Sequence, residues 1–273
     1  MTKVNTLENN PALPIHNHSH AEDPKVRRCL IIGGGAIGQA LAEYLSSEEF
    51  AAVAAQEGVC QTEVIATWRT TKPVVQNDQL RWLQLDPTNQ NSVAVFAQRI
   101  RQLWPDVHWL INCVGMLSGE QGPEKRIQDF SPTFFLHNCQ VNVVPTLLLA
   151  QYFSDFLTTS ESSVFAALSA KVGSIEDNRL GGWYSYRSSK AALNMALKTL
   201  SIEWQRRYPK RCVVALHPGT TRSPLSAPFS ANVPPARYFT AYKTARLLAK
   251  QLLLLQPHHT GDFISWNGER LPW

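Results

Sequence analysis

An apolar segment, a glycine-rich turn and an alanine-rich segment follow one another near the start of the chain. Residues 29–32 are continuously apolar, Gly33-Gly34-Gly35-Ala36-Ile37-Gly38 comes next, and residues 39–45 have helical character. A Gly-x-Gly-x-x-Gly between a strand and a helix lets the backbone turn tightly and approach a pyrophosphate, which the helix N-terminus attracts. The pattern predicts a nucleotide site at Gly33, Gly35, Ala36, Ile37 and Gly38. A glycine-rich turn without a ligand is the alternative.

Strand-like and helix-like segments alternate along nearly all of the remaining chain. Strands are expected at residues 29–32, 63–67, 81–85, 108–112, 163–168, 211–216 and 261–265. Helices are expected at residues 39–45, 91–103, 131–157, 186–207 and 240–254. This alternation predicts an α/β fold with a doubly wound parallel sheet, the Rossmann fold, in a single domain over residues 26–273. Residues 46–61 are expected either to lengthen the first helix or to form a surface excursion.

Residues 1–25 are polar, contain three prolines and show no periodicity, so they are interpreted as a disordered N-terminal arm. The arm carries His16, His18 and His20 at alternate positions. Three histidines can hold a metal ion, but without acidic or thiol partners a solvated tail is favoured. No metal site is therefore expected.

Composition excludes several classes of function. The net charge is +5, but the basic residues are dispersed, and a nucleic-acid partner would need a concentrated patch. No apolar run is long enough to span a membrane. The five cysteines form no Cys-x-x-Cys pair and are odd in number, which favours free thiols and a cytoplasmic location.

Tyr186 and Lys190 are the strongest catalytic candidates. They are four residues apart, so on a helix they share one face. A lysine ammonium there favours the phenolate and lowers the tyrosine pKa, which suits a proton donor or acceptor. Ser169 follows the apolar run 163–168 and is expected at the carboxyl end of a strand, where open α/β sheets bind ligands. A lone Tyr-x-x-x-Lys is also common on exposed helices.

A long apolar helix is expected over residues 131–157, starting at Ser131-Pro132. Pro145 breaks the hydrogen-bond ladder near Asn142. A buried helix kinked beside an asparagine can free a carbonyl to hold water. The alternative for Asn142 is a polar side chain satisfied within the packing.

The ends of the second, third and fourth strands suggest how a nucleotide is selected. The second strand ends in Trp68-Arg69-Thr70-Thr71, without the carboxylate that bonds a ribose diol in NAD sites. Arg69 suits a 2′-phosphate instead, which predicts a preference for NADP(H) over NAD(H); an ordinary surface arginine is the alternative. Asp86 is expected either to reach the adenine or to cap the next helix. Asn112 and Gly115 let the backbone lie flat against the cofactor.

Taken in order, these elements resemble the short-chain dehydrogenase/reductase family over essentially everything after the arm. The resemblance rests on the glycine turn, Asn112-Cys-Val-Gly115, Asn142, Ser169, Tyr186 with Lys190, and Pro218-Gly219. Val172-Gly-Ser-Ile175, the segment 178–186 and the final Leu-Pro-Trp273 resemble the C-factor-like branch. Ser169 lies further from Tyr186 than is usual in the family.

The resemblance implies an oxidoreductase that interconverts a carbonyl and an alcohol. Ser169 and Tyr186 would polarise the carbonyl, Tyr186 would transfer the proton, and Lys190 would bind the nicotinamide ribose and be resupplied through water near Asn142. Further cofactor contacts are implied at Pro218, Gly219 and Thr221.

The expected partners are a small carbonyl or alcohol substrate and a second copy of the chain, in a homodimer or homotetramer. Residues 222–238 contain four prolines and are expected to form a mobile cover with apolar and aromatic lining. Two other classes of function stay open. One is a nucleotide-binding signalling or redox-sensing protein of the C-factor type, and the other is a lyase or epimerase on the same fold.

Overall fold

The computed structural model describes residues 25–74, 77, 79–117, 119 and 122–273. The predicted arm, including its three histidines, lies outside the described residues except for Lys25. The carbonyl of Lys25 accepts a hydrogen bond from the Cys60 backbone N–H at 2.9 Å.

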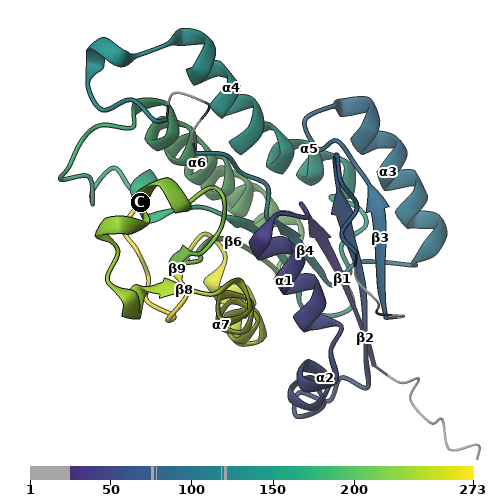
Figure 1. Cartoon of the computed structure of the whole chain (residues 1–273). Coiled ribbons are helices and arrows are strands. Elements are labelled where there is room, and N and C mark those ends of the chain that lie inside the picture. Colours follow the sequence, from purple (N-terminus) through teal and green to yellow (C-terminus); the bar gives the residue numbers. More distant parts are fainter. Residues whose placement is uncertain (1–24, 75–76, 78, 118, 120–121) are drawn as a thin grey trace, which may run out of the picture.

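Seven parallel strands form one sheet in the order β3-β2-β1-β4-β5-β6-β9 (Figure 1). The strands are β1 (Val26–Ile32), β2 (Gln61–Trp68), β3 (Leu80–Gln84), β4 (Trp109–Asn112), β5 (Ser163–Leu168), β6 (Arg211–His217) and β9 (Phe263–Ser265). Because every pairing is parallel, all carboxyl ends meet at one edge of the sheet. Two short strands, β7 (Thr220–Thr221) and β8 (Tyr238–Phe239), pair separately.

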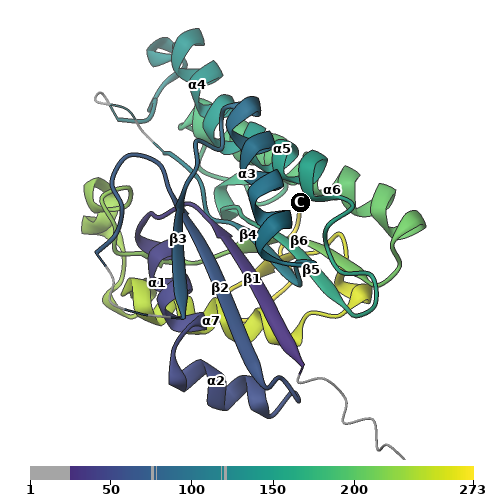
Figure 2. The same cartoon turned by 90° about the vertical axis from the view of Figure 1, so that its right-hand side faces the viewer.

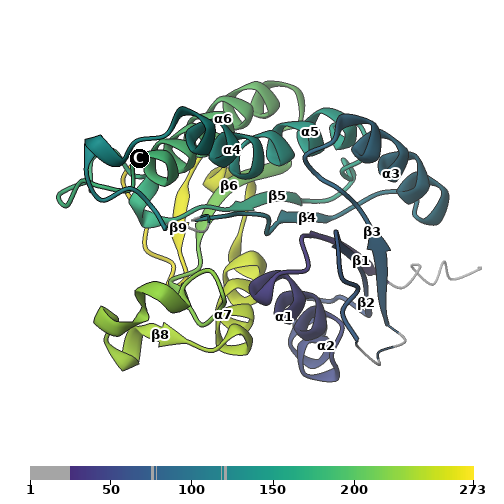
Figure 3. The ribbon, with the colours of Figure 1, turned by 45° about the horizontal axis from the view of Figure 1, so that its top comes forward.

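Helices cover both faces of the sheet, as Figure 3 shows. One face carries α1 (Ala36–Leu45), α2 (Glu48–Ala55) and α7 (Ala241–Leu254), and the other carries α3 (Gln90–Leu103), α4 (Pro132–Asn142), α5 (Val144–Phe153) and α6 (Tyr184–Arg207). Successive side chains of a strand point to opposite faces, so Ile31 enters one apolar core and its neighbours Leu30 and Ile32 enter the other. The predicted doubly wound sheet is confirmed.

The segment 46–61 forms a helix of its own, α2, rather than an extension of α1. The Ser46 hydroxyl donates to the Ala42 carbonyl at 2.9 Å and closes the end of α1. The Ser47 hydroxyl accepts from the Phe50 N–H at 3.2 Å and caps the start of α2. Figure 2 shows α2 packed below α1, beside the amino ends of the strands.

The helix predicted over residues 131–157 is broken at Val143, as Pro145 requires. Pro145 has no N–H to donate, and the Thr146 N–H turns back to the Val143 carbonyl at 3.1 Å. Among the described hydrogen bonds, none reaches the backbone carbonyl of Asn142. The break therefore leaves that carbonyl free to accept another donor.

The chain changes direction in the sheet between β1 and β4. Strands β2 and β3 lie on one side of β1, and β4, β5, β6 and β9 lie on the other. Open α/β sheets bind their ligands outside the carboxyl ends of the strands at this switch point.

The proline-rich segment 222–238 contains two short 3-10 helices, η3 (Ala227–Asn232) and η4 (Pro235–Arg237), before β8.

In the part of the chain that the structure describes, no helix has the length and apolarity needed to cross a bilayer.

Candidate active site

The glycine turn follows β1 at the switch point and leads directly into α1. The Gly33 N–H donates to the Thr67 hydroxyl at 2.9 Å, which ties the turn to β2. A Cβ added to Gly38 would lie 1.9 Å from the Gly33 carbonyl oxygen, so only glycine lets α1 start this close to the turn. A Cβ added to Gly35 would meet nothing within 4 Å. The turn therefore opens onto free space at the N-terminus of α1, with Ala36 and Ile37 as its first residues.

The next two strands place Arg69 and Asp86 at the same edge. Arg69 directly follows β2 and is exposed, and its carbonyl accepts from the Gln84 side chain at 3.2 Å. Asp86 accepts from both the hydroxyl and the N–H of Thr88, at 2.7 Å and 3.0 Å, and these bonds hold the pKa of its carboxyl below the usual value. Asn89, not Asp86, caps α3, so the helix-cap alternative for Asp86 is wrong.

Asn112 and Gly115 shape the turn after β4. The Asn112 amide donates to the Thr146 hydroxyl at 2.8 Å, and its oxygen accepts from the Val114 N–H at 3.0 Å. A Cβ added to Gly115 would lie 3.3 Å from both the Asn142 Oδ1 and the Lys190 Nζ. The absence of a side chain at Gly115 thus lets the backbone lie directly against these two residues.

Asn142 is completely buried at the end of α4. Its Oδ1 accepts from the Met116 N–H at 2.8 Å, and its Nδ2 donates to the Met116 carbonyl at 3.0 Å and to the Ser189 hydroxyl at 2.9 Å. Both alternatives considered for this residue are compatible with these contacts. The side chain is satisfied within the packing, while the backbone carbonyl has no described donor.

Lys190 is buried on α6, with 4% of its surface exposed. Its Nζ donates to the Leu168 carbonyl at 2.9 Å, at the end of β5. Burial lowers the pKa of this amine to about 8. Lys190 is consequently a cation at neutral pH that loses its proton in a mildly alkaline solution.

Tyr186 lies one turn before Lys190, with its ring centroid 6.0 Å from the lysine Nζ. Burial raises the pKa of its hydroxyl, which is opposite to the direction expected from the lysine. The expectation that Lys190 lowers this pKa is therefore wrong for the described structure. The physical reason is that the ammonium points to the Leu168 carbonyl, and removal from water disfavours the phenolate.

Ser169 directly follows β5, as predicted, and is buried. Its hydroxyl donates to the Asn194 Oδ1 at 2.6 Å, and the Asn194 amide donates to the Gly173 carbonyl at 3.3 Å. Asn194 lies eight residues after Tyr186 on α6, which is about 12 Å along the helix axis. A hydroxyl has one proton, so Ser169 in this arrangement gives it to Asn194 and not to a ligand.

The segment after β6 is tied to α7 and to the start of the proline-rich segment. Pro218 precedes Gly219, whose φ of +75° favours glycine. The hydroxyls of Thr221 and Thr244 share a hydrogen bond of 2.7 Å, and the Thr221 carbonyl accepts from the Ser226 hydroxyl. Thr221 is buried, so its predicted cofactor contact would require either its backbone or a hydroxyl released from its hydrogen bond with Thr244.

Three residues that organise this site were not selected from the sequence: Thr67, Ser189 and Asn194. Ser189 lies three residues after Tyr186 on α6, and Asn194 lies four residues after Lys190, so helical spacing from these two candidates identifies both. Thr67 holds Gly33 from the neighbouring strand. The sequence gives no signal for that contact, because it depends on how β1 and β2 align.

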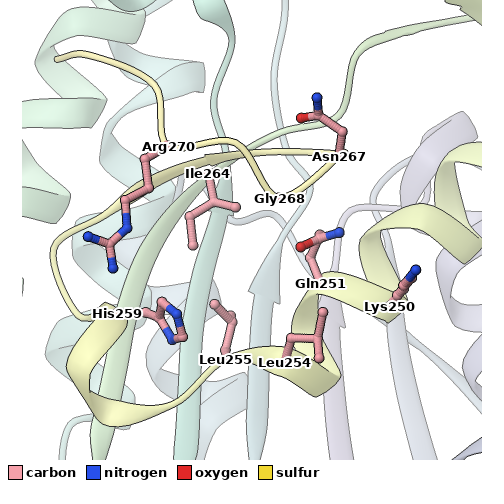
Figure 4. A pocket seen from close by; sticks show the side chains of 9 residues that line it. All are labelled: Lys250, Gln251, Leu254, Leu255, His259, Ile264, Asn267, Gly268 and Arg270. Carbon is pink, nitrogen blue, oxygen red and sulfur yellow. The ribbon is translucent and has the colours of Figure 1, made fainter.

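A pocket of about 280 Å³ lies beside the edge strand β9 and the end of α7 (Figure 4). None of the predicted site residues lines it. The Gln251 side chain that points into it donates to the Trp266 carbonyl at 3.2 Å, and Arg270 pairs with Asp262 at 3.0 Å. Gln251 and Arg270 are thus already engaged with the protein, and the strand ends remain the better candidate site.

Comparison with known proteins decides the family of this chain. The family described as short chain dehydrogenase matches residues 27–234. The chain belongs to this family. The short-chain dehydrogenase/reductases are a family of oxidoreductases, and the family predicted from the sequence is confirmed.

Two curated relatives and one solved structure illustrate the similarity. C-signal of Myxococcus xanthus is 35% identical over 109 residues, which are 40% of this chain and 60% of the relative. An uncharacterised oxidoreductase of Schizosaccharomyces pombe is 25% identical over 259 residues, 88% of this chain and 95% of the relative. The NADPH-bound carbonyl reductase from chicken fatty liver is 23% identical, with a TM-score of 0.76 over 93% of this chain and 97% of that chain. This last likeness shows the fold.

Proposed function

We propose that this protein is an NADP(H)-dependent carbonyl reductase that transfers hydride between the nucleotide and a small carbonyl compound. The observation that carries the proposal is the convergence of Tyr186, Lys190 and Gly115 at the strand edge next to the glycine turn. A buried proton donor, a buried amine and a bare backbone surface meet at the place where open α/β sheets bind nucleotides. The carbonyl reductase with a similar fold is described as NADPH-bound.

The residues around the glycine turn fit a pyrophosphate. The space at Gly35 is open, the first turn of α1 contains no acidic residue, and its N–H groups face that space. Gly115 offers backbone where a ribose or nicotinamide ring would lie against Lys190. The nucleotide, when bound, supplies the hydride, and the protein supplies position and charge.

Tyr186 is the proposed general acid in the reduction direction. Because burial raises its pKa, its hydroxyl stays protonated at neutral pH and can donate to the oxygen that becomes the alcohol. Lys190, still charged below a pH of about 8, stabilises negative charge nearby. The free Asn142 carbonyl can accept a hydrogen bond from a water on the route to Lys190.

Ser169 remains the proposed second donor to the substrate carbonyl. To play this role, its hydroxyl has to rotate away from the Asn194 Oδ1, because the same proton cannot serve both acceptors. The serine is therefore expected to contribute less to the rate than Tyr186.

Arg69 is the proposed reason for choosing NADP(H). It follows β2 directly and is exposed, and its charge adds to the Thr88 hydrogen bonds that lower the pKa of the nearby Asp86 carboxyl. No carboxylate stands at the end of β2 to repel a 2′-phosphate. The guanidinium can bind such a phosphate by charge-assisted hydrogen bonds.

We also infer that the protein is a homodimer or homotetramer through α4, α5 and α6. Leu136 on α4 and Met195 on α6 are each 66% exposed, and Leu147 on α5 and Ile202 on α6 are about half exposed. Large apolar side chains in these numbers on adjacent helices favour a covered surface. Figure 3 shows these three helices together on one face.

The similarity to C-signal supports a second candidate, a nucleotide-binding signalling protein. The test is NADPH oxidation with a panel of aldehydes, ketones and quinones. A reductase oxidises NADPH only when a carbonyl is added. A sensor binds NADPH without carbonyl-dependent oxidation, and a lyase or epimerase converts its substrate without net oxidation, so either result would reject the proposed reductase.

A further inference from the structure

The residues just before α6 form an unusual turn next to Tyr186. Gly181, Gly182 and Trp183 have consecutive positive φ angles of 64°, 65° and 53°. Trp183 is the one non-glycine residue with a positive φ among the described residues. Bulky side chains rarely adopt this conformation, and where it persists the surrounding structure enforces it, often at a binding site.

Contacts from the Glu124 segment and from α6 hold this turn in place. The Trp183 N–H donates to the Glu124 carbonyl, and the Glu124 carboxylate accepts from the hydroxyl and N–H of Ser185. The Arg187 Nε donates to the Gly181 and Gly182 carbonyls at 3.2 Å and 3.1 Å. The charges of Glu124 and Arg187 are thus engaged with the turn and its helix.

The enforced turn directs the indole ring of Trp183 toward the catalytic tyrosine and the proline-rich segment. The Trp183 ring centroid lies 6.3 Å from that of Tyr186 in an edge arrangement and 5.0 Å from that of Phe229. Phe229 comes from η3, more than forty residues later in the sequence. Trp183 and Phe229 are only half-buried, so both rings keep surface that a ligand can contact.

We propose that Trp183 and Phe229 form an aromatic wall beside Tyr186 that selects carbonyls attached to a flat, conjugated apolar ring. The inference rests on the proposed reductase function and specifies its substrate class. Aromatic rings attract one another in edge and offset geometries beyond the effect of burial alone. Glu124 and Arg187 already have partners in the turn, so these two charged side chains are not available to a polar or ionic substrate.

The test compares two aldehydes with the same number of carbon atoms, benzaldehyde and cyclohexanecarbaldehyde. The ratio of their kcat/KM values is measured for the parent and for Trp183→Leu and Phe229→Leu. Intrinsic differences in reactivity between the aldehydes cancel when the ratios of parent and variant are compared. Each variant is expected to lower the benzaldehyde preference by about 2- to 12-fold, the range for loss of an aromatic pair.

Tyr184→Leu is the matched control, because Tyr184 is an exposed aromatic residue directly after the turn, at the start of α6. It should leave the ratio unchanged. Phe229 lies outside the strained turn, so Phe229→Leu alone tests the proposal if circular dichroism shows that Trp183→Leu is misfolded.

Unchanged kcat/KM ratios in the folded variants would refute substrate selection by Trp183 and Phe229 without affecting the proposed reductase function. A parent that reduces neither aldehyde but reduces other carbonyls would have the same meaning. A parent that reduces no carbonyl would overturn both proposals.

Discussion

Replacing Lys190 by methionine should change how the stability of the protein depends on pH. Burial lowers the pKa of Lys190 from 10.5 to about 8. At 1.36 kcal/mol per pKa unit, the buried charge costs about 3 kcal/mol of folding free energy below pH 8. Between about pH 8 and 10.5 the unfolded chain binds more protons at this site than the folded protein, so stability rises with pH across that window.

The measurement is urea unfolding of parent and Lys190→Met at pH 7.0, 8.0 and 9.5, at one protein concentration. The variant leaves the Leu168 carbonyl without its donor, but that loss does not depend on pH. Buried thiols such as Cys29, whose pKa is raised to about 12, titrate equally in both proteins and cancel.

Relative to the variant, the parent should gain about 2 kcal/mol between pH 7.0 and 9.5, almost all of it above pH 8. A stability difference that stays constant over this range would show that Lys190 keeps an ordinary pKa in the folded protein.

Three further outcomes are expected. Ser169→Ala should lower kcat/KM less than Tyr186→Phe does. It should also destabilise the fold by about 1–3 kcal/mol, because the buried Asn194 oxygen loses its donor. An equal loss of activity for the two variants in steady-state assays would mean that the serine proton reaches the substrate. Arg69→Ala should reduce the preference for NADPH over NADH in kcat/KM by about 10- to 100-fold. An undiminished preference would show that another residue binds the 2′-phosphate. Light scattering at micromolar concentration should give the mass of a dimer or tetramer, and a monomer would refute the proposed association through α4, α5 and α6.

The parallel sheet, though not its strand order, followed from the sequence because most strands contain an apolar run bounded by turn residues. Such runs are typical of a parallel sheet buried on both faces. The break near Pro145 followed from the missing N–H alone. The separate helix α2 did not follow, since Ser46 and Ser47 mark the end of one helix and the start of the next in a segment otherwise rich in alanine and glutamate.

Helical spacing predicts that Tyr186 and Lys190 are neighbours, but it does not predict their hydrogen bonds or their proton affinities. Spacing places Tyr186 and Lys190 on one helix face, yet it does not reveal that the lysine amine points to the Leu168 carbonyl. The pKa of Tyr186 depends on how much water the packing removes, which no local pattern records. The Ser169 hydroxyl turns to Asn194 because α6 lies across the end of β5, and that packing is set by the whole sheet.

Tyr186 is proposed to transfer the proton in an NADPH-dependent carbonyl reduction. The most direct test is NADPH oxidation by parent and Tyr186→Phe with the best carbonyl of the panel, alongside NADPH binding measured by fluorescence. The variant should bind NADPH much as the parent does while kcat falls by about 10²–10⁴-fold or more, because the ring stays and only the proton donor is lost. A variant that turns over at close to the parent rate would contradict it.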